Sequence, residues 1–422
     1  MTKRIISLFF FFFALHYLLV AQGVWQTKVY NPKIRSVNMH MQGAELSGFF
    51  FELNNPNRIV FSFDELGFDF KNYQYSFVHC NADWTQSSLL PSEYLDGYPE
   101  DYINQSSASF NTLTDFVHYE VLIPGEFTRI KKSGNYILKV FEVGNSDKPE
   151  LTFRFVLYEN LARIKAQIKR SDVVSERERL QEVDFSFFPP FAINNPFLDV
   201  KATLLQNGRW DNAITGLKPN FIRENEIVFN YDKESSFTAG NEYRYMDLTT
   251  IRIQTERVAR IITSEGLTKI TAIPDLPRYN LPYSFYRDLN GAFLIRNQDG
   301  TGSPETDADY VEVLFTLPME AISAGTLYIN GDFTAGQFNE RYQMKYNYDR
   351  KAYECVLPLK QGLYNYQYVL ANQNKQGASS EPVEGNFFQT ENNYIILVYF
   401  RDFSADFDRV IGCYTANSLR GY

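Results

Sequence analysis

Residue types that bind metals or transfer protons are scarce in this sequence, apart from the carboxylates. Only three histidines follow position 21: His40, His79 and His118. None of them has a partner at the spacing of a zinc site. His79 and Cys80 are adjacent in a strand-like run and should point to opposite faces of a sheet. We therefore expect structural histidines and no metal site.

The chain also lacks the local signatures of common enzymes. It has no Gly-x-Ser-x-Gly elbow, no phosphate-binding loop and no dinucleotide-binding fingerprint. The acidic loop at 299–309 does not match the ligand spacing of an EF-hand, which favours a solvated hairpin loop over a calcium site. A hydrolytic carboxylate pair stays open as an alternative among residues such as Asp64, Glu65, Asp96, Asp101, Asp247 and Asp332. We expect a protein that is not an enzyme and binds no cofactor.

A binding surface is the more plausible functional feature. Residues 81–110 form a long irregular segment that is rich in Tyr and acidic residues. Its Trp84, Tyr94, Tyr98 and Tyr102 are the residue types that dominate interface energetics. We predict that these four side chains contact a protein partner. The alternative is that they pack the segment onto its own sheet.

Composition and charge narrow the classes of protein and partner. The 422 residues are 44% hydrophobic and 16% aromatic, which excludes disorder as the dominant state. The net charge is −9, from 41 basic and 50 acidic residues. Nucleic acids and anionic membrane surfaces bind basic faces, so neither is the expected partner.

The N-terminus has the pattern of an export signal. Lys3 and Arg4 precede an apolar run at residues 5–20, and Ala21 before Gln22 offers a cleavage point. The alternative, a membrane anchor, is disfavoured because the run is shorter than the roughly 20 residues that span a bilayer. Removal of residues 1–21 takes away two positive charges and gives a net charge of −11. We predict a cleaved signal peptide and an exported protein that does not insert into the membrane.

Short alternating runs with turn signals between them predict an all-β fold. Residues 59–63 and 151–158 alternate, and no long helical period competes with them. A Gly-x-Tyr pattern opens strand-like runs at Gly134 and Gly362, and a looser copy begins at Gly240. In immunoglobulin-like sandwiches, a Tyr early in the penultimate strand turns the corner between the two sheets. The alternative is that the pattern recurs by chance in a Tyr-rich chain.

The spacing of these copies predicts three tandem immunoglobulin-like or early-set β-sandwiches. We place the domain boundaries at 22–158, 159–275 and 276–400, and we expect a loosely packed tail at 401–422. The odd set of Cys80, Cys355 and Cys413 favours buried free thiols, although one disulfide bridge stays open.

The first domain resembles a known family in three segments: residues 75–84 (YSFVHCNADW), 92–98 (SEYLDGY) and 133–140 (SGNYILKV). These segments look like the N-terminal domain of the plug protein of the type IX secretion system. The resemblance implies a periplasmic plug, monomeric when free, that occupies the periplasmic opening of the large SprA-like outer-membrane β-barrel translocon. It carries over no catalytic residue.

The third domain is similar to early-set sandwiches related to glycogen-binding modules, in particular through Asn330, Gly331 and Asp332. This likeness implies an alternative function, an exported carbohydrate-binding protein. Such modules stack sugars on exposed tryptophans, but Trp25, Trp84 and Trp210 all lie outside this domain.

Overall fold

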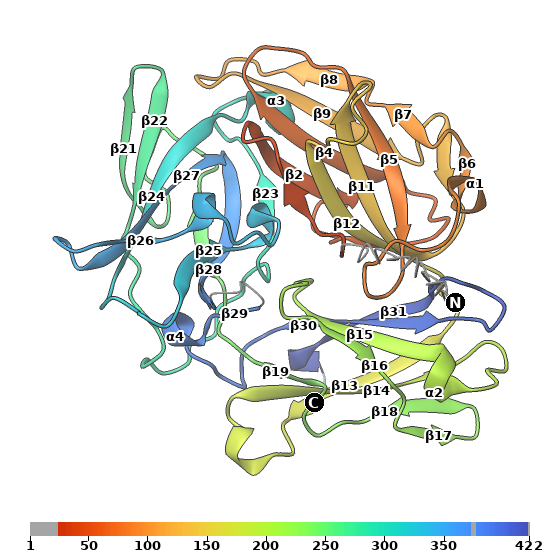
Figure 1. The fold of residues 1–422 in the computed structure, drawn as a ribbon. Coiled ribbons are helices and arrows are strands. Elements are labelled where there is room, and N and C mark those ends of the chain that lie inside the picture. The colour runs from red at the N-terminus through yellow and green to blue at the C-terminus, as the bar shows by residue number, and fades with distance from the viewer. Residues whose placement is uncertain (1–23, 373–376, 421–422) are drawn as a thin grey trace, which may run out of the picture.

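The computed structural model describes residues 24–372 and 377–420, so the predicted signal peptide at 1–21 lies outside the described residues. The chain forms three bodies of two packed β-sheets each, connected by short helices and loops (Figure 1). The predicted all-β class of sandwich domains is confirmed.

The N-terminal sandwich contains two mostly antiparallel sheets. One sheet has the order β1-β12-β11-β5-β7, with β3 parallel to β12, and the other has the order β2-β4-β9-β8. A short ribbon pairs β6 with β10 beside helix α1. Its elements are β1 (Lys28–Val29), β2 (Ile34–Met41), β3 (Phe50–Glu52), β4 (Ile59–Leu66), β5 (Tyr73–Cys80), α1 (Pro91–Tyr94), β6 (Leu95–Gly97), β7 (Glu100–Tyr102), β8 (Gln105–Ala108), β9 (Phe116–Ile123), β10 (Thr128–Ile130), β11 (Gly134–Glu142) and β12 (Leu151–Tyr158).

The middle sandwich is built from two separate stretches of the chain. One sheet has the order β13-β14-β18-β17, with β19 beside β14, and the other has the order β16-β15-β30-β31. Its elements are β13 (Arg163–Arg170), η1 (Val174–Glu176), β14 (Leu180–Phe188), α2 (Pro196–Asp199), β15 (Val200–Gln206), β16 (Ile214–Leu217), β17 (Phe221–Arg223), β18 (Glu226–Phe229), β19 (Ser236–Thr238), β30 (Asn393–Phe400), β31 (Arg409–Asn417) and η4 (Ser418–Arg420).

The third sandwich lies between these two stretches. One sheet is centred on β28, which pairs with β20, β23, β25 and β29, and the other has the order β21-β22-β24-β27-β26. Its elements are β20 (Arg244–Asp247), β21 (Val258–Ser264), β22 (Leu267–Ala272), β23 (Phe293–Ile295), α3 (Pro304–Asp307), β24 (Tyr310–Pro318), β25 (Thr326–Asn330), η2 (Asp332–Thr334), η3 (Glu340–Tyr342), β26 (Lys345–Asn347), β27 (Ala352–Lys360), β28 (Gly362–Ala371), β29 (Ala378–Ser379) and α4 (Glu381–Glu384).

This arrangement corrects the predicted tandem order of the second and third domains. Strand β30 pairs with β15 over seven residue pairs, from Val200–Phe400 to Gln206–Tyr394. Strands β20 to β22, which we assigned to 159–275, pair instead with β28 and β24 of the third sandwich. The third sandwich is therefore an insertion in the middle one. The predicted break at 275/276 separates strands of one core.

The predicted loose tail at 401–422 is also wrong over most of its length. Residues 409–417 form β31, the edge strand beside β30, and Val410 and Ile411 are fully buried. The sequence loses its alternation there because β31 packs against β13 of its own sandwich and also against the N-terminal sandwich.

Tyrosine corners are present in the two sandwiches where the Gly-x-Tyr pattern is strongest. The hydroxyls of Tyr136 and Tyr364 each donate to the backbone carbonyl four residues earlier, at 2.8 and 2.6 Å. The looser third copy differs, because the Tyr243 hydroxyl accepts from the Gln367 amide and its strand belongs to the third sandwich. The two strong copies thus mark real corners, and the weak copy does not mark the middle domain.

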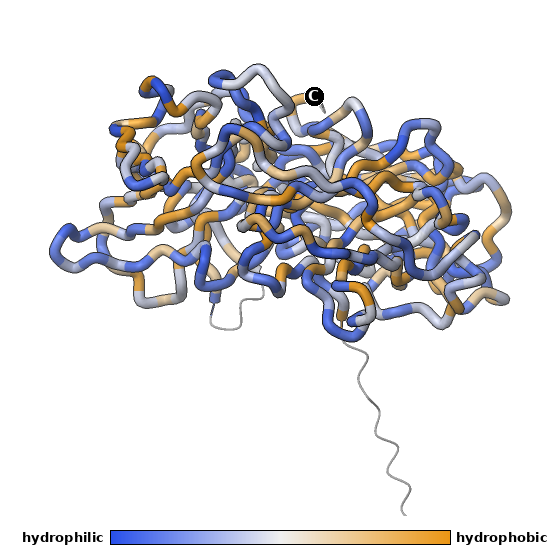
Figure 2. Tube along the Cα trace, turned by 90° about the horizontal axis from the view of Figure 1, so that it is seen from above, coloured by the Kyte–Doolittle hydropathy of each residue, from blue (hydrophilic) through white to orange (hydrophobic). Residues whose placement is uncertain are grey.

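Alternation decides which residues form each core. In β5, Tyr73, Tyr75 and Phe77 point into the N-terminal core, whereas the intervening positions are less buried. Figure 2 shows hydrophobic segments concentrated inside the bodies and hydrophilic segments in the peripheral loops. Residues on both inner faces of a sandwich interdigitate in this way.

The N-terminal and middle sandwiches also pack sheet against sheet. The outer side of the β11–β12 sheet contributes Ile137 and Val156, and the sheet containing β15 and β30 contributes Leu205, Leu397 and Tyr399. Four sheets are thus stacked, and the two central sheets are buried on both faces. This explains why β11 and β15 are almost continuously buried rather than alternating.

Candidate functional site

Two of the four predicted interface aromatics are buried inside the chain. Trp84 is 3% exposed, and its indole meets that of Trp210 edge-on with ring centroids 4.7 Å apart. The Arg154 guanidinium lies 4.3 Å from the Trp84 ring. Trp84 therefore joins the N-terminal and middle sandwiches, and its assignment to a partner interface is wrong for this conformation.

Tyr94 is also buried, at the end of α1. Its hydroxyl donates to the backbone carbonyl of Phe77 at 2.9 Å, and its ring packs beside His79 and Tyr136. Burial raises the pKa of Tyr94. The alternative interpretation, that the segment packs onto its own sheet, therefore holds for Tyr94, whereas Trp84 is buried against the middle sandwich.

Tyr98 and Tyr102 are exposed, by 64% and 54%. The Tyr98 ring packs against Phe127 with centroids 6.2 Å apart, so that ring is held in place although it faces solvent. Tyr102 ends β7 and pairs with Gln74 of β5. These two residues stay available for a partner.

Both tyrosines lie on one lateral edge of the N-terminal sandwich, at residues 98–108, which we call the open edge. Strand β7 is the last strand of one sheet, and β8, which follows it in sequence, is the last strand of the other (Figure 1). All four residues of β8 are exposed, and within the described residues no further strand pairs with its outer side. An unpaired edge of this kind can accept an added strand or a flat partner surface.

Exposed apolar side chains extend this surface at one end of the sandwich. Phe68 and Phe70 lie in the β4–β5 loop, and Phe110 and Leu113 lie in the β8–β9 loop. The amide of Gly67 donates to the carbonyl of Asp115 at 2.8 Å, which holds the two loops side by side. The sequence analysis did not single out Phe68 and Phe70, although two aromatics in a six-residue connection between strands were a usable signal.

A buried ion pair fixes the N-terminal sandwich to the third sandwich. The Lys360 ammonium lies 2.6 Å from an Asp64 carboxylate oxygen, and both side chains are almost fully buried. Asp64 also accepts from the Tyr310 hydroxyl and pairs with the His118 imidazole, each at 2.6 Å. Burial alone would raise the pKa of Asp64, but Lys360 and His118 outweigh it and hold the pKa below its usual range.

The acidic loop at 299–309 belongs to the same contact. The buried Asp309 carboxylate accepts the backbone N–H groups of Leu113 and Thr114, at 2.7 and 3.0 Å. The predicted solvated hairpin loop is therefore wrong at this end, because Asp309 caps backbone groups of the N-terminal sandwich.

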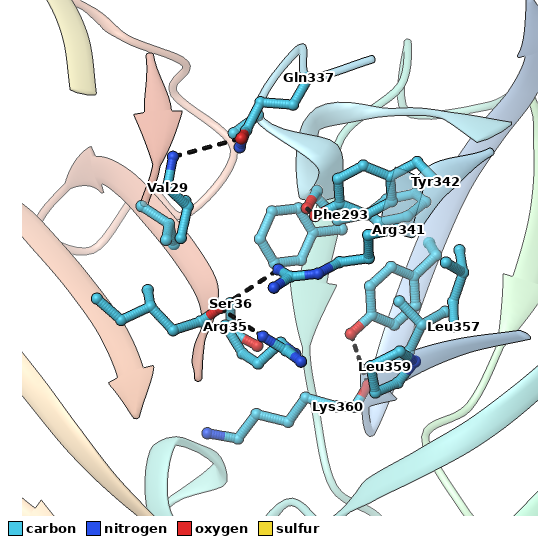
Figure 3. Close-up of a pocket in the computed structure, with 16 residues that line it drawn as sticks. Val29, Arg35, Ser36, Phe293, Gln337, Arg341, Tyr342, Leu357, Leu359 and Lys360 are labelled. Carbon is cyan, nitrogen blue, oxygen red and sulfur yellow. Dashed lines mark hydrogen bonds between the residues drawn. The ribbon is translucent and has the colours of Figure 1, made fainter. Parts of the chain in front are cut away.

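A small cavity lies at the other side of this contact (Figure 3). The Val29 amide donates to Gln337, and Arg341 donates to the carbonyl of Pro32, so both sandwiches line it. Burial and the charge of Arg341 together lower the pKa of Arg35. The volume of about 30 Å³ suits a water molecule rather than a ligand.

Two larger cavities, of about 440 and 450 Å³, lie where the three sandwiches meet. The first is lined by residues from all three, including Arg154, Trp210, Tyr243 and Asp332. Burial raises the pKa of Asp332 to about 7, opposed by Arg209. Neither cavity contains a nucleophile paired with a base, so their geometry does not indicate a reaction.

The described histidines and cysteines have structural surroundings. The ring nitrogens of His79 are 2.8 Å from the Ser87 hydroxyl and 3.1 Å from the Ser133 carbonyl, and burial lowers the pKa of His79 to about 4. The three thiols of Cys80, Cys355 and Cys413 are free, as predicted, and burial raises the pKa of each to about 12.

One acidic cluster combines groups with shifted pKa values. Carboxylate oxygens of Glu242, Asp288 and Glu391 lie within 4.8 Å of one another. Burial, followed by the charges of the other two, raises the pKa of Glu242 to about 7, and burial raises that of Asp288 to about 6. None of these side chains lines the cavities described above, which does not favour an acid–base pair acting on a substrate.

Within the described residues, no helix is long and apolar enough to cross a membrane. Residues 34–159 match the family model of the type 9 secretion system plug protein 1st domain. No curated protein matches the chain. A crystal structure of a hypothetical protein from Parabacteroides merdae is similar over 94% of this chain and 100% of its own, with 34% identity and a TM-score of 0.90. Residues 34–159 therefore carry the first domain of the type 9 secretion system plug proteins, which supports a plug role associated with that secretion system.

Proposed function

We propose that this protein is a non-enzymatic periplasmic plug, exported by a cleaved signal peptide. It would bind and occlude the periplasmic opening of a SprA-like outer-membrane β-barrel when no substrate is in transit. The observation that carries the proposal is the plug-family match over residues 34–159, which cover the sandwich that also bears the open edge.

The architecture suits occlusion by a folded body. A wide pore is blocked only by an object that keeps its shape, and here all three sandwiches are joined by buried contacts. The Lys360–Asp64 pair fixes the third sandwich, and the stacked sheets around Trp84 fix the middle one. The three sandwiches are thus packed against one another rather than connected only by flexible linkers.

The open edge is the surface that we assign to the barrel. Exposed tyrosines contribute large contact area with a polar hydroxyl, and they tolerate water when the partner is absent. Reversible plugging requires an interface of moderate affinity that is partly polar. Tyr98 and Tyr102, which precede the polar strand β8 on the open edge, provide that combination.

A pull-down from detergent-solubilised envelopes tests the proposal. Tagged mature protein should retain an outer-membrane barrel of very high mass, identified by mass spectrometry. Tyr98→Ser together with Tyr102→Ser should weaken retention at least tenfold, because two central aromatic contacts are worth roughly 1–2 kcal/mol each. Tyr348→Ser is the matched control, since Tyr348 is an exposed tyrosine of the third sandwich, and it should bind like the parent.

Two results would count against the proposal at different levels. Retention of no barrel by the parent protein would contradict the plug function. Equal retention by the double variant and the parent would leave the plug function standing and contradict the open edge as its docking surface.

A further inference from the structure

The acidic cluster of Glu242, Asp288 and Glu391 lies where the chain passes between the middle and third sandwiches. Glu242 is on the outgoing segment just before β20, and Glu391 is on the returning segment just before β30. Asp288 comes from the loop that precedes β23. The backbone amide of Glu391 donates to Glu242 Oε1 at 3.0 Å, so the two crossing segments touch. A ligand bound here would therefore contact both the middle sandwich and the third sandwich, which is inserted in it.

Two buried oxygen atoms at this place have no hydrogen-bond donor. Glu242 is fully buried; its Oε1 accepts from the Tyr283 hydroxyl at 2.5 Å, but its Oε2 has no partner. Asn290 approaches the other two carboxylates, with its amide nitrogen 3.3 Å from Glu391 Oε2 and its backbone N–H 2.7 Å from Asp288. The side-chain oxygen of Asn290 is also buried and unpartnered. Buried acceptors are normally satisfied, so two in one place point to a missing positive group.

The protein itself does not supply that positive charge within the described residues, because no lysine or arginine forms an ion pair with any of the three carboxylates. Arg278 contacts the backbone of the cluster, since it donates to the carbonyl of Glu242, but its ion pair is with Glu384. A second acidic cluster shows the contrast. There the Lys169 ammonium lies within 3.0 Å of Asp172, Glu182 and Asp184.

We propose that Glu242, Asp288 and Glu391 form a calcium site that clamps the inserted third sandwich to the middle sandwich. All the donors are hard oxygen atoms, which calcium prefers. Oxygens on opposite sides of a calcium ion, at about 2.4 Å each, are about 4.8 Å apart. The three carboxylate oxygens lie within that span of one another. Calcium accepts irregular shells made of protein oxygens, whereas magnesium requires a near-ideal octahedron and usually keeps several waters. This inference goes beyond the plug function and does not depend on it.

Calcium titration into the chelator-treated mature protein tests the site directly. We expect saturable heat of binding by calorimetry and a rise in Tm of about 5 °C at 1 mM calcium, because a ligand that binds only the folded state stabilises it. Magnesium at the same concentration should give less than a third of that rise. Absence of heat and of a Tm shift, or an equal effect of magnesium, would overturn the proposal.

A variant pair excludes a general salt effect. Glu242→Gln with Asp288→Asn should abolish the calcium response while raising Tm in the presence of chelator, because the repulsion between buried carboxylates is removed. Asp184→Asn is the matched control from the lysine-centred cluster, and it should keep the full calcium response. A calcium response that survives in the double variant would place binding elsewhere and refute the assignment.

Discussion

Replacement of Lys360 by methionine should loosen the contact between the N-terminal and third sandwiches. Methionine keeps most of the aliphatic length but removes the charge 2.6 Å from Asp64. It also removes a hydrogen bond to the carbonyl of Glu305 and the ammonium that lies 4.1 Å from the ring of Phe116. A buried carboxylate without its cation costs about 3–5 kcal/mol. Because His118 and Tyr310 still face Asp64, we expect a loss near 3 kcal/mol.

Urea unfolding followed by tryptophan fluorescence measures this loss, and small-angle scattering reports whether the sandwiches separate. The Asp64→Asn, Lys360→Met double variant should lose less than the sum of the single variants, by at least 1–2 kcal/mol. Lys269→Met is the matched control, since its ammonium lies 3.9 Å from Glu312 and both side chains are exposed. It should change the free energy of unfolding by less than about 0.5 kcal/mol.

Acid should act on the same contact with a defined sign. The folded-state pKa of Asp64 is held low, so its contribution to stability is present above the unfolded-state pKa and is lost as the pH falls through the folded-state pKa. The Asp64→Asn variant should lack this acid-dependent part. If Lys360→Met is within about 1 kcal/mol of the parent, or if its loss adds to that of Asp64→Asn, the buried pair does not hold the sandwiches together.

Two further predictions concern the stability contributed by the tyrosine corners and by the buried His79. Tyr136→Phe and Tyr364→Phe should each lower the free energy of unfolding by about 1–2 kcal/mol, because each leaves a carbonyl at the corner without its donor, half-buried at Lys132 and buried at Lys360. Urea curves check this, and parent-like stability in both variants would mean that the corners are unimportant. The His79 imidazole should titrate near pH 4 in NMR spectra of the folded protein, so as the pH falls from 6.5 to 4 stability should decrease by up to about 3 kcal/mol. Titration near 6.5 would show that His79 is not buried in its neutral form.

Local sequence pattern was enough to predict the all-β fold class. The strand-like run at 73–80 and the two strong tyrosine corners depend on neighbours in sequence, and the structure contains both, as β5 and as the hydroxyl contacts of Tyr136 and Tyr364. The alternation predicted at 151–158 does not appear as alternating burial in β12, because that sheet is covered on both faces. The insertion could not be predicted in this way. The pairing of β15 with β30 joins residues about 190 positions apart, and nothing in the alternation of either strand specifies its partner.

The interface prediction does not suit the buried Trp84 and Tyr94, for a related reason, and it stays a prediction for Tyr98 and Tyr102. Residue type alone suggested that Trp84 and Tyr98 were equivalent, because both are aromatic and lie in one irregular segment. Trp84 has a backbone φ of 65° and turns toward Arg154 and Trp210, whereas Tyr98 faces solvent beside the edge strand. Burial against another sandwich is a tertiary property, and segment composition carries no signal for it.

The insertion also sets an order in which the chain can fold. The contact between Asn207 and Asn393 joins residues 186 positions apart, and closing a flexible loop of that length costs roughly 5 kcal/mol in chain entropy. A third sandwich that has already folded brings its two ends together, as the contact between Glu242 and Glu391 shows, and most of that cost is then removed. The third sandwich, which is inserted in the middle one, should thus fold first. The middle sandwich should complete its sheet last, when β30 pairs with β15 and β31 pairs with β30.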